Sequence, residues 1–154
     1  MLKVRSSNKA VIIKDNHILA VKKKDANGFF YILPGGGQEH GETVIESLKR
    51  ECLEETGYNI KIGDLLYVRD YIAVNHGVNK ADMEINLHQV ELMFLCEIDG
   101  DKQEPISGPD AGQIGIEWLD LNNIKNIRLY PLAMREYLNA ALTQTRTIYL
   151  GDAN

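Results

Sequence analysis

The stretch GGQEHGETVIESLKRECLEETGY, residues 36–58, is the most informative part of this chain of 154 residues. If residues 43–56 form a helix, Glu51 is spaced three and four positions from Glu54 and Glu55, so the three side chains lie on neighbouring surface. Like charges at this spacing destabilise a helix by about 0.2–0.5 kcal/mol per pair, which a bound cation would relieve. Because Mg²⁺ and Mn²⁺ prefer oxygen ligands, the segment predicts a divalent-metal site.

Capping signals mark the limits of this helix. Thr43 and Glu46 have the spacing of a Thr-x-x-Glu capping box, and Gly57 is a natural helix stop. Apolar residues recur at the helical period at Val44, Ile45, Leu48 and Cys52. We therefore expect one face of the helix to pack on a sheet and the other face to carry the three glutamates.

The residues before the helix are rich in glycine. The run from Pro34 to Gly37 is unsuited to a helix interior or a central strand, because proline lacks an N–H donor and glycine weakens a strand. We expect this run to be a flexible loop whose backbone approaches its neighbours closely.

The composition is typical of a globular α/β domain, with 44% apolar and 25% charged residues, and its length fits one domain covering residues 1–154. The net charge of −5 gives no reason to expect a nucleic-acid polymer as partner. The sequence contains no stretch of membrane-spanning length and no signal-peptide core at its start. Cys52 and Cys96 are expected to be buried hydrophobic residues rather than a disulfide, so we expect a cytoplasmic protein.

Patterns of apolar residues and turn residues predict the other elements. Strands are expected at residues 9–14, 17–23, 29–33, 58–74, 87–98 and 114–119, with a hairpin turn at Asp15-Asn16 and a break near Gly63-Asp64. A polar connection is expected at 75–86, a long loop at 99–112 and a second helix at 131–143 with core contacts from Leu132, Met134, Leu138 and Leu142.

The spacing of the glycine and acidic residues resembles the signature of the Nudix hydrolases. The matching residues are Gly36, Glu42, Arg50, Glu51, Glu54, Glu55 and Gly57. Cys52 and Tyr58 depart mildly from it, because they stand where an aliphatic residue is more usual. The resemblance implies an α/β/α sandwich around a mixed β-sheet.

The resemblance also implies an activity. It implies a Mg²⁺-dependent hydrolase, with Mn²⁺ as a substitute, that cleaves a pyrophosphate bond in a nucleoside diphosphate linked to another moiety. The substrate would be a nucleoside triphosphate, which is slightly favoured, ADP-ribose or another nucleotide sugar, or a dinucleoside polyphosphate. The alternative is a catalytically silent Nudix module that senses a nucleotide or binds a partner. A homodimer is compatible with either function.

The resemblance assigns roles to the box residues. The implied metal ligands are the side chains of Glu51, Glu54 and Glu55 and the main-chain carbonyl of Gly35. Catalytic roles are implied for Glu51 and Glu54, with Glu42 and Arg50 orienting them, and the charge of Arg50 would keep nearby carboxylates ionised.

The general base is left open. In some family members it is an acidic residue in the loop before the tryptophan-bearing strand, but Gly112 and Gln113 stand at the nearest positions here. Asp110 is the closest acidic substitute, so the choice lies between Glu51 and Asp110. Three further candidates, Glu91, Glu97 and Glu117, are more readily explained as ordinary strand residues.

Candidate substrate-binding residues are Lys23, Phe30 and Tyr31. Lys23 belongs to a short basic run that could reach substrate phosphates. One of the rings of Phe29, Phe30 and Tyr31, which precede the glycine run, could stack on a nucleobase or pack in the core. We expect Trp118 to be a core residue, and His76 and His88 to be structural or surface residues.

Overall fold

The computed structural model describes residues 2–78 and 83–154. In these ranges the strands are β1 (Val4–Lys14), β2 (His17–Asp25), β3 (Gly28–Ile32), β4 (Gly35–Gly37), β5 (Tyr58–Ile72), β6 (His88–Gln103), β7 (Gly115–Asp120), β8 (Leu129–Tyr130) and β9 (Ile148–Asp152). The helices are α1 (Val44–Thr56) and the 3-10 helices η1 (Ala73–His76), η2 (Met83–Asn86), η3 (Leu121–Asn126), η4 (Leu132–Glu136) and η5 (Leu138–Thr143).

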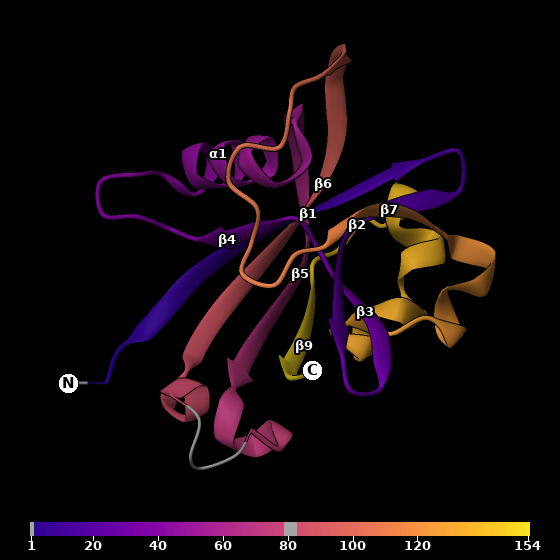
Figure 1. The fold of residues 1–154 in the computed structure, drawn as a ribbon. Coiled ribbons are helices and arrows are strands. Elements are labelled where there is room, and N and C mark those ends of the chain that lie inside the picture. Colours follow the sequence, from indigo (N-terminus) through magenta and orange to yellow (C-terminus); the bar gives the residue numbers. More distant parts are fainter. Residues whose placement is uncertain (1, 79–82) are drawn as a thin grey trace.

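The strands form one curled, mixed sheet (Figure 1). Its main path runs β8-β3-β2-β1-β6-β5-β9, while β4 pairs with β1 and β7 pairs with β2. The pairs β1/β6, β3/β8 and β5/β9 are parallel and the others are antiparallel. The expected α/β fold around a mixed sheet is therefore confirmed.

Both faces of the sheet are covered. Successive side chains of a strand point to opposite sides, so neighbouring residues of one strand show what packs on each face. In β1, Ala10 and Ile12 pack in a cluster with Leu48 of α1. Val11, between them, packs in a second cluster with Met134 of η4. The helix α1 therefore covers one face and the C-terminal 3-10 helices cover the other (Figure 1).

The capping signals of α1 are confirmed. The Thr43 hydroxyl accepts from the Glu46 N–H at 3.2 Å, and the Glu46 carboxylate accepts from the Thr43 N–H at 2.7 Å. Gly57 ends the helix in the left-handed conformation, with φ 76°. These local bonds fix where the acidic second half of the helix begins and ends.

The faces of α1 differ from expectation at two positions. Ile45 is 41% exposed, so it does not belong to the packed stripe. Glu55 is only 1% exposed and lies on the packed side, with Leu48 and Cys52. The reason is the helical period: Glu55 follows Leu48 by two turns, so the sheet that covers Leu48 also covers Glu55.

The glycine run is not a loop as expected. Gly35, Gly36 and Gly37 form strand β4, which pairs antiparallel with β1. The close approach is the physical reason for glycine here: a Cβ on Gly35 would lie 2.0 Å from the Asn8 carbonyl oxygen, and Gly35 has φ 132°. The strand therefore exists because these residues lack side chains.

The second predicted helix is also different. Residues 131–143 form η4 and η5, separated at Tyr137, rather than one α-helix. The N–H groups of Met134 and Tyr137 bond to carbonyls three residues earlier, so the repeat is tighter than in an α-helix. Met134 and Leu138 are in the core as expected, but Leu142 is 65% exposed.

The remaining strands are present with changed bounds: β1, β2 and β6 are longer than predicted, β5 is shorter, and β3 and β7 are shifted by one residue. Asp15 and Asn16 form the hairpin turn with φ 49° and 58°. The β5/β6 register shifts between Ile62 and Leu65, at the expected break, and β6 continues to Gln103 because it pairs there with Tyr58. η1 begins two residues before the expected polar connection of residues 75–86, which also contains η2 and whose residues 79–82 lie outside the described part.

The prediction for the cysteines is tested by their burial. Cys52 and Cys96 are free and buried, as expected. Among the described residues, every helix is too short or too polar to cross a membrane.

Substitution of Gly35 tests the packing of β4 on β1. Gly35→Ala should lower the free energy of unfolding by about 3 kcal/mol or more, since overpacking and strain at positive φ each cost about 1–3 kcal/mol. Gly115→Ala is the matched control, because a Cβ there meets nothing within 4 Å. Chemical denaturation followed by circular dichroism measures both. Equal stabilities of the two variants would contradict this account of β4.

Candidate active site

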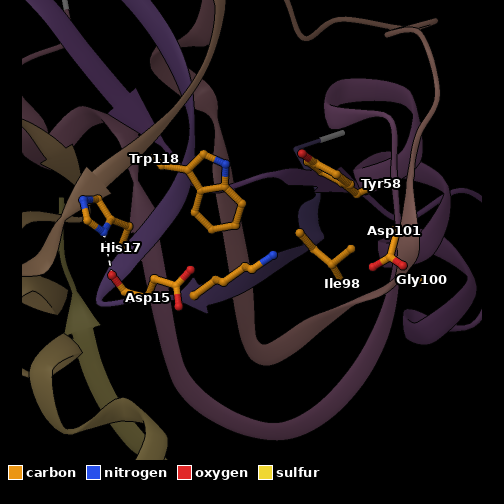
Figure 2. A pocket seen from close by; sticks show the side chains of 8 residues that line it. Asp15, His17, Tyr58, Ile98, Gly100, Asp101 and Trp118 are labelled. Carbon is orange, nitrogen blue, oxygen red and sulfur yellow. Dashed lines mark hydrogen bonds between the residues drawn. The ribbon is translucent and has the colours of Figure 1, made fainter.

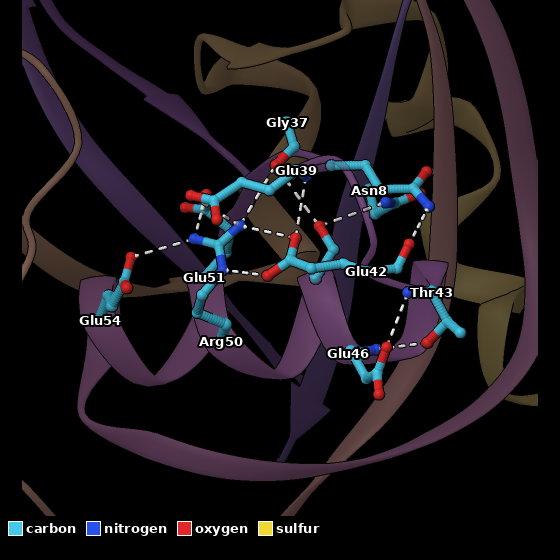
Figure 3. A network of polar contacts seen from close by, with 11 residues as sticks. Asn8, Gly37, Glu39, Glu42, Thr43, Glu46, Arg50, Glu51 and Glu54 are labelled. Carbon is cyan, nitrogen blue, oxygen red and sulfur yellow. Dashed lines mark hydrogen bonds and ion pairs between the residues drawn. The ribbon is translucent and has the colours of Figure 1, made fainter.

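Arg50, in the second half of α1, joins the acidic residues of the box (Figure 3). Its Nε and Nη2 donate to the two oxygens of Glu42 at 2.5 and 3.1 Å, which makes a bidentate pair. Its Nη1 donates to Glu51 Oε1 at 2.9 Å and to Glu54 Oε2 at 3.4 Å. Hydrogen bonding to Arg50 holds the pKa of Glu42 below its usual value. One guanidinium therefore gathers three carboxylates.

The glycines of β4 make room for this cluster. A Cβ on Gly36 would lie 2.8 Å from the carboxylate carbon of Glu51, so the missing side chain leaves the space that this carboxylate fills. Arg50 Nη2 also donates to the Gly37 carbonyl at 3.3 Å. The strand and the helix are thus in direct polar contact at the box.

The loop between β6 and β7 crosses the end of α1. The N–H groups of Ser107 and Gly108 donate to the Glu54 carbonyl at 3.2 and 3.1 Å. A Cβ on Gly108 would lie 3.2 Å from the Cβ of Glu54, so the loop packs tightly against this residue. The side chain of Glu54 remains 38% exposed and therefore accessible to a ligand.

Glu55 lies beneath β4. Its Oε2 accepts from the Gly35 N–H at 2.9 Å, and Lys9 Nζ donates to the Gly35 carbonyl at 2.9 Å. Burial raises the pKa of Glu55 to about 7. The charge of Lys9 and the Gly35 N–H act to lower this pKa, whereas the charges of Asp110 and Glu51 act to raise it.

As they stand, the predicted metal ligands do not form a ready cluster. In the described ranges, no three His, Cys, Asp or Glu side chains are arranged to hold a metal ion. The physical reason is that the Arg50 guanidinium bonds both Glu51 and Glu54, while Glu55 bonds the Gly35 N–H.

The donor set nevertheless fits a hard divalent cation. All of the donors are oxygens, and Glu51 and Glu54 already share one cationic nitrogen, Arg50 Nη1. Gly36 leaves the Glu51 carboxylate its space against β4. A cation at this place requires that the Glu51 and Glu54 carboxylates turn from Nη1, while Nε and Nη2 retain Glu42. Lys9 must also release the Gly35 carbonyl, and Glu55 must release the Gly35 N–H.

The loop between β6 and β7 also carries Asp110, which pairs with Lys23 of β2. Lys23 Nζ pairs with Asp110 Oδ2 at 2.5 Å. The Asp110 N–H donates to Gln113 Oε1, and Gln113 Nε2 donates to the Glu55 carbonyl, both at 2.9 Å. Gln113 thus anchors the loop on α1. This role does not follow from the sequence, in which residue 113 is simply a side chain that cannot ionise.

The two candidate aromatic residues point to opposite faces. Phe30 lies opposite Lys23 in the β2/β3 ladder, on the face that carries α1. Tyr31 is 8% exposed in the core of the other face, and its hydroxyl donates to Glu117 Oε2 at 2.9 Å. Burial raises the pKa of Tyr31 to about 12. The structure therefore leaves Phe30, and not Tyr31, accessible for stacking.

The surroundings of Phe30 include two residues that the sequence analysis missed. The Tyr130 ring meets Phe30 edge-on with ring centroids 6.1 Å apart, and Arg128 Cζ lies 5.5 Å from the Phe30 ring centre. Parallel pairing of β3 with β8 brings them together. No local pattern in the sequence predicts that pairing of segments about 100 residues apart.

The remaining candidates lie in other contacts. Glu91 is buried and pairs with Arg69 at 3.0 Å, and Glu117 pairs with Lys22 at 3.2 Å. His76 and His88 bond to the carboxylates of Asp152 and Asp70. Trp118 packs against the cluster under α1, as expected for a core residue. Within the described ranges, none of these residues is hydrogen-bonded to a residue of the box.

Comparisons with known proteins agree with the box. A model of the NUDIX domain matches residues 5–140. The chain is 35% identical over 119 residues to an ADP-ribose pyrophosphatase of Methanocaldococcus jannaschii, covering 76% of this chain and 62% of that protein. It is 34% identical over 91 residues to the nucleoside triphosphatase NudI of Salmonella agona, covering 56% of this chain and 63% of that protein. The matches thus span less than two thirds of the length of each relative.

The fold also resembles solved structures of the same family. A NUDIX hydrolase structure from Nitrosomonas europaea superposes with a TM-score of 0.70 at 20% identity, covering 92% of both chains. At this identity the likeness establishes the fold alone. The family model, however, extends from β1 to the C-terminal 3-10 helices and includes the whole box. This chain therefore belongs to the Nudix family.

Proposed function

We propose that this chain is a divalent-metal-dependent hydrolase that cleaves a pyrophosphate bond in a nucleoside diphosphate linked to another moiety. The observation that carries the proposal is the convergence of Glu51 and Glu54 on one cationic nitrogen beside Gly36. The names of the two relatives support the substrate class, because ADP-ribose and nucleoside triphosphates both contain a pyrophosphate bond.

The metal would be held by Glu51, Glu54 and Glu55 and by the Gly35 carbonyl. When bound, Mg²⁺ or Mn²⁺ neutralises phosphate oxygens and makes a bound water more acidic. Arg50 would keep its bidentate pair with Glu42 and so hold the helix face in place. Lys9 would have to release the Gly35 carbonyl, since its ammonium now bonds that oxygen.

We assign the general base to Glu51 rather than to Asp110. Asp110 pairs with Lys23 through Oδ2 and, among the described residues, its side chain shares no hydrogen bond with a box residue, whereas Arg50 Nη1 holds Glu51 beside Glu54. Arg50 bonds only Oε1 of Glu51, and Oε2 accepts no hydrogen bond from the described residues. The Glu51 carboxylate therefore has a lone oxygen available to take a proton from water.

The proposed substrate contacts are side chains on the face of the sheet that carries α1. Lys23 and Phe30 are neighbours on this face, so Lys23 would contact a phosphate and Phe30 would stack on the base. Arg128 lies over the Phe30 ring and would add a cationic contact to the same platform. Because the longer of the two matches is to a protein named for ADP-ribose, we favour ADP-ribose over a triphosphate as substrate.

The competing function is a silent nucleotide sensor. All the acidic residues of the box are present here, which favours turnover. A panel of ADP-ribose, nucleotide sugars, triphosphates and dinucleoside polyphosphates, incubated with Mg²⁺, separates the two functions. Release of a nucleoside monophosphate that EDTA abolishes is expected. Saturable binding without turnover of any substrate would instead establish the sensor.

Glu54→Gln should reduce kcat/KM by about 100-fold or more, because the variant loses a charged ligand for the cation that stabilises the transition state. Glu97→Gln is the matched control, since Glu97 is exposed on β6 and is not in the box. Steady-state kinetics on the best substrate measure both variants. Unchanged activity of Glu54→Gln would contradict the assignment.

Magnesium should stabilise the fold, and more so at higher pH. Metal binding needs an ionised Glu55, whose pKa of about 7 leaves it partly protonated below that pH. The rise in Tm on adding Mg²⁺ should therefore be larger at pH 8 than at pH 6. Differential scanning calorimetry measures it, and Glu55→Gln should remove the difference between the two pH values. An equal rise at both pH values in the wild type would count against Glu55 as a ligand.

Phe30 should matter for substrate affinity and not for the chemical step. Phe30→Ala should raise KM about tenfold with kcat little changed, since stacking of a base on an aromatic ring is worth roughly 1–3 kcal/mol. Phe29→Ala is the control, because Phe29 is 48% exposed and points to the opposite face, beneath the ammonium of Lys22. Equal effects of the two substitutions would refute the stacking platform.

A further inference from the structure

A cavity opens where the sheet divides. The strands β1 and β6 run side by side as far as the pair Ile12 and Cys96. Beyond this pair β1 continues with β2, through Lys14 and His17, while β6 continues with β5. The two strand ends separate, and a cavity of about 520 Å³ lies between them (Figure 2).

The cavity is distinct from the candidate active site. None of its lining residues is a predicted metal ligand, base or substrate contact. Tyr58 lines it, and this residue stands where the family signature usually has an aliphatic side chain. The departure from the signature therefore supplies a wall of the cavity.

Two aromatic residues face each other across the cavity. Figure 2 shows that the indole nitrogen of Trp118 and the hydroxyl of Tyr58 point toward one another. In the described part of the chain neither group has a hydrogen-bond partner, so both can bond a ligand. Ile98 adds an apolar surface between the walls. Aromatic walls with polar edges suit a planar heteroaromatic ring.

The charged residues of the cavity limit the kind of ligand. Lys14, Asp15 and Asp101 line it and are exposed, and their formal charges sum to one net negative charge. This balance disfavours a polyphosphate, whose negative charges would face two carboxylates. The carboxylates can accept hydrogen bonds from sugar hydroxyls, and the Lys14 ammonium can donate to a carbonyl or ring nitrogen. An uncharged ligand with hydroxyl groups matches this pattern.

We propose that this cavity is a second ligand site, which binds an uncharged purine nucleoside with its base between Trp118 and Tyr58 and its sugar hydroxyls at Asp15 and Asp101. A volume of about 520 Å³ lies within the range of roughly 300–1,000 Å³ that is usual for small-molecule sites. The site is independent of metal and of the proposed hydrolase activity, so its test does not depend on either.

Fluorescence provides a direct test, because Trp118 is the only tryptophan of the chain. The full chain, in EDTA to remove metal from the box, is titrated with adenosine and with guanosine, with excitation beyond their absorption bands. Saturable quenching by at least one nucleoside is expected. The matching 5′-monophosphate should bind more weakly, because its phosphate adds negative charge beside Asp15 and Asp101.

Variants locate the site. Tyr58→Leu, which restores the usual aliphatic residue, should weaken nucleoside binding about tenfold, because it removes both a hydroxyl that can hydrogen-bond the base and an aromatic contact surface, each worth roughly 0.5–1.5 kcal/mol. Asp101→Asn should weaken it severalfold, and because Asp101 is exposed this variant should keep the fold. Asp99→Asn is the control, since Asp99 lies on β6 like Asp101 but pairs with Lys61 of β5 and does not line the cavity.

Four results would overturn the proposal. These are no saturable quenching up to the solubility limits of both nucleosides, equal or tighter binding of the monophosphate, equal effects of Asp101→Asn and Asp99→Asn, and loss of quenching in Glu54→Gln. The last result would place the nucleoside at the box instead. If Tyr58→Leu unfolds, as judged by circular dichroism, the comparison of Asp101→Asn with Asp99→Asn still decides.

Discussion

The site depends on one cation, the guanidinium of Arg50, among three carboxylates. Arg50 bonds Glu42 with two nitrogens and uses the third for both Glu51 and Glu54. Without that charge the glutamates would repel one another at the helix surface. The third nitrogen therefore stands where a divalent cation would be more effective, since a metal ion brings two charges and can also contact phosphate. In this account, metal binding is an exchange of cations and needs no rebuilding of the helix.

The rest of the fold keeps that cluster in register with its neighbours. The capping box at Thr43 and the stop at Gly57 fix the ends of α1. The glycine strand β4 lies against β1 so closely that a side chain at Gly35 would collide with backbone. Gln113 ties the loop before β7 to the same helix through the Glu55 carbonyl. Three separate segments of the chain are thus held within reach of the box.

The sequence predicted best what local chemistry decides. The capping residues, the hairpin at Asp15 and Asn16 and the α/β class all followed from short-range rules and are confirmed. Contacts between segments that are distant in the sequence could not be predicted from such rules. Burial of Glu55 depends on which helix face meets the sheet, and the neighbourhood of Phe30 depends on the pairing of β3 with β8. The metal-ligand roles of the glutamates remain predictions.

The most direct measurement of the central claim is a crystal structure of the chain soaked in Mn²⁺, with anomalous diffraction to place the metal. The account predicts an anomalous peak bonded by carboxylate oxygens of Glu51 and Glu54, with both carboxylates turned away from Arg50 Nη1 and the Arg50–Glu42 pair intact. An ion bound elsewhere, or an Arg50 that still bridges Glu51 and Glu54 at saturating Mn²⁺, would contradict it.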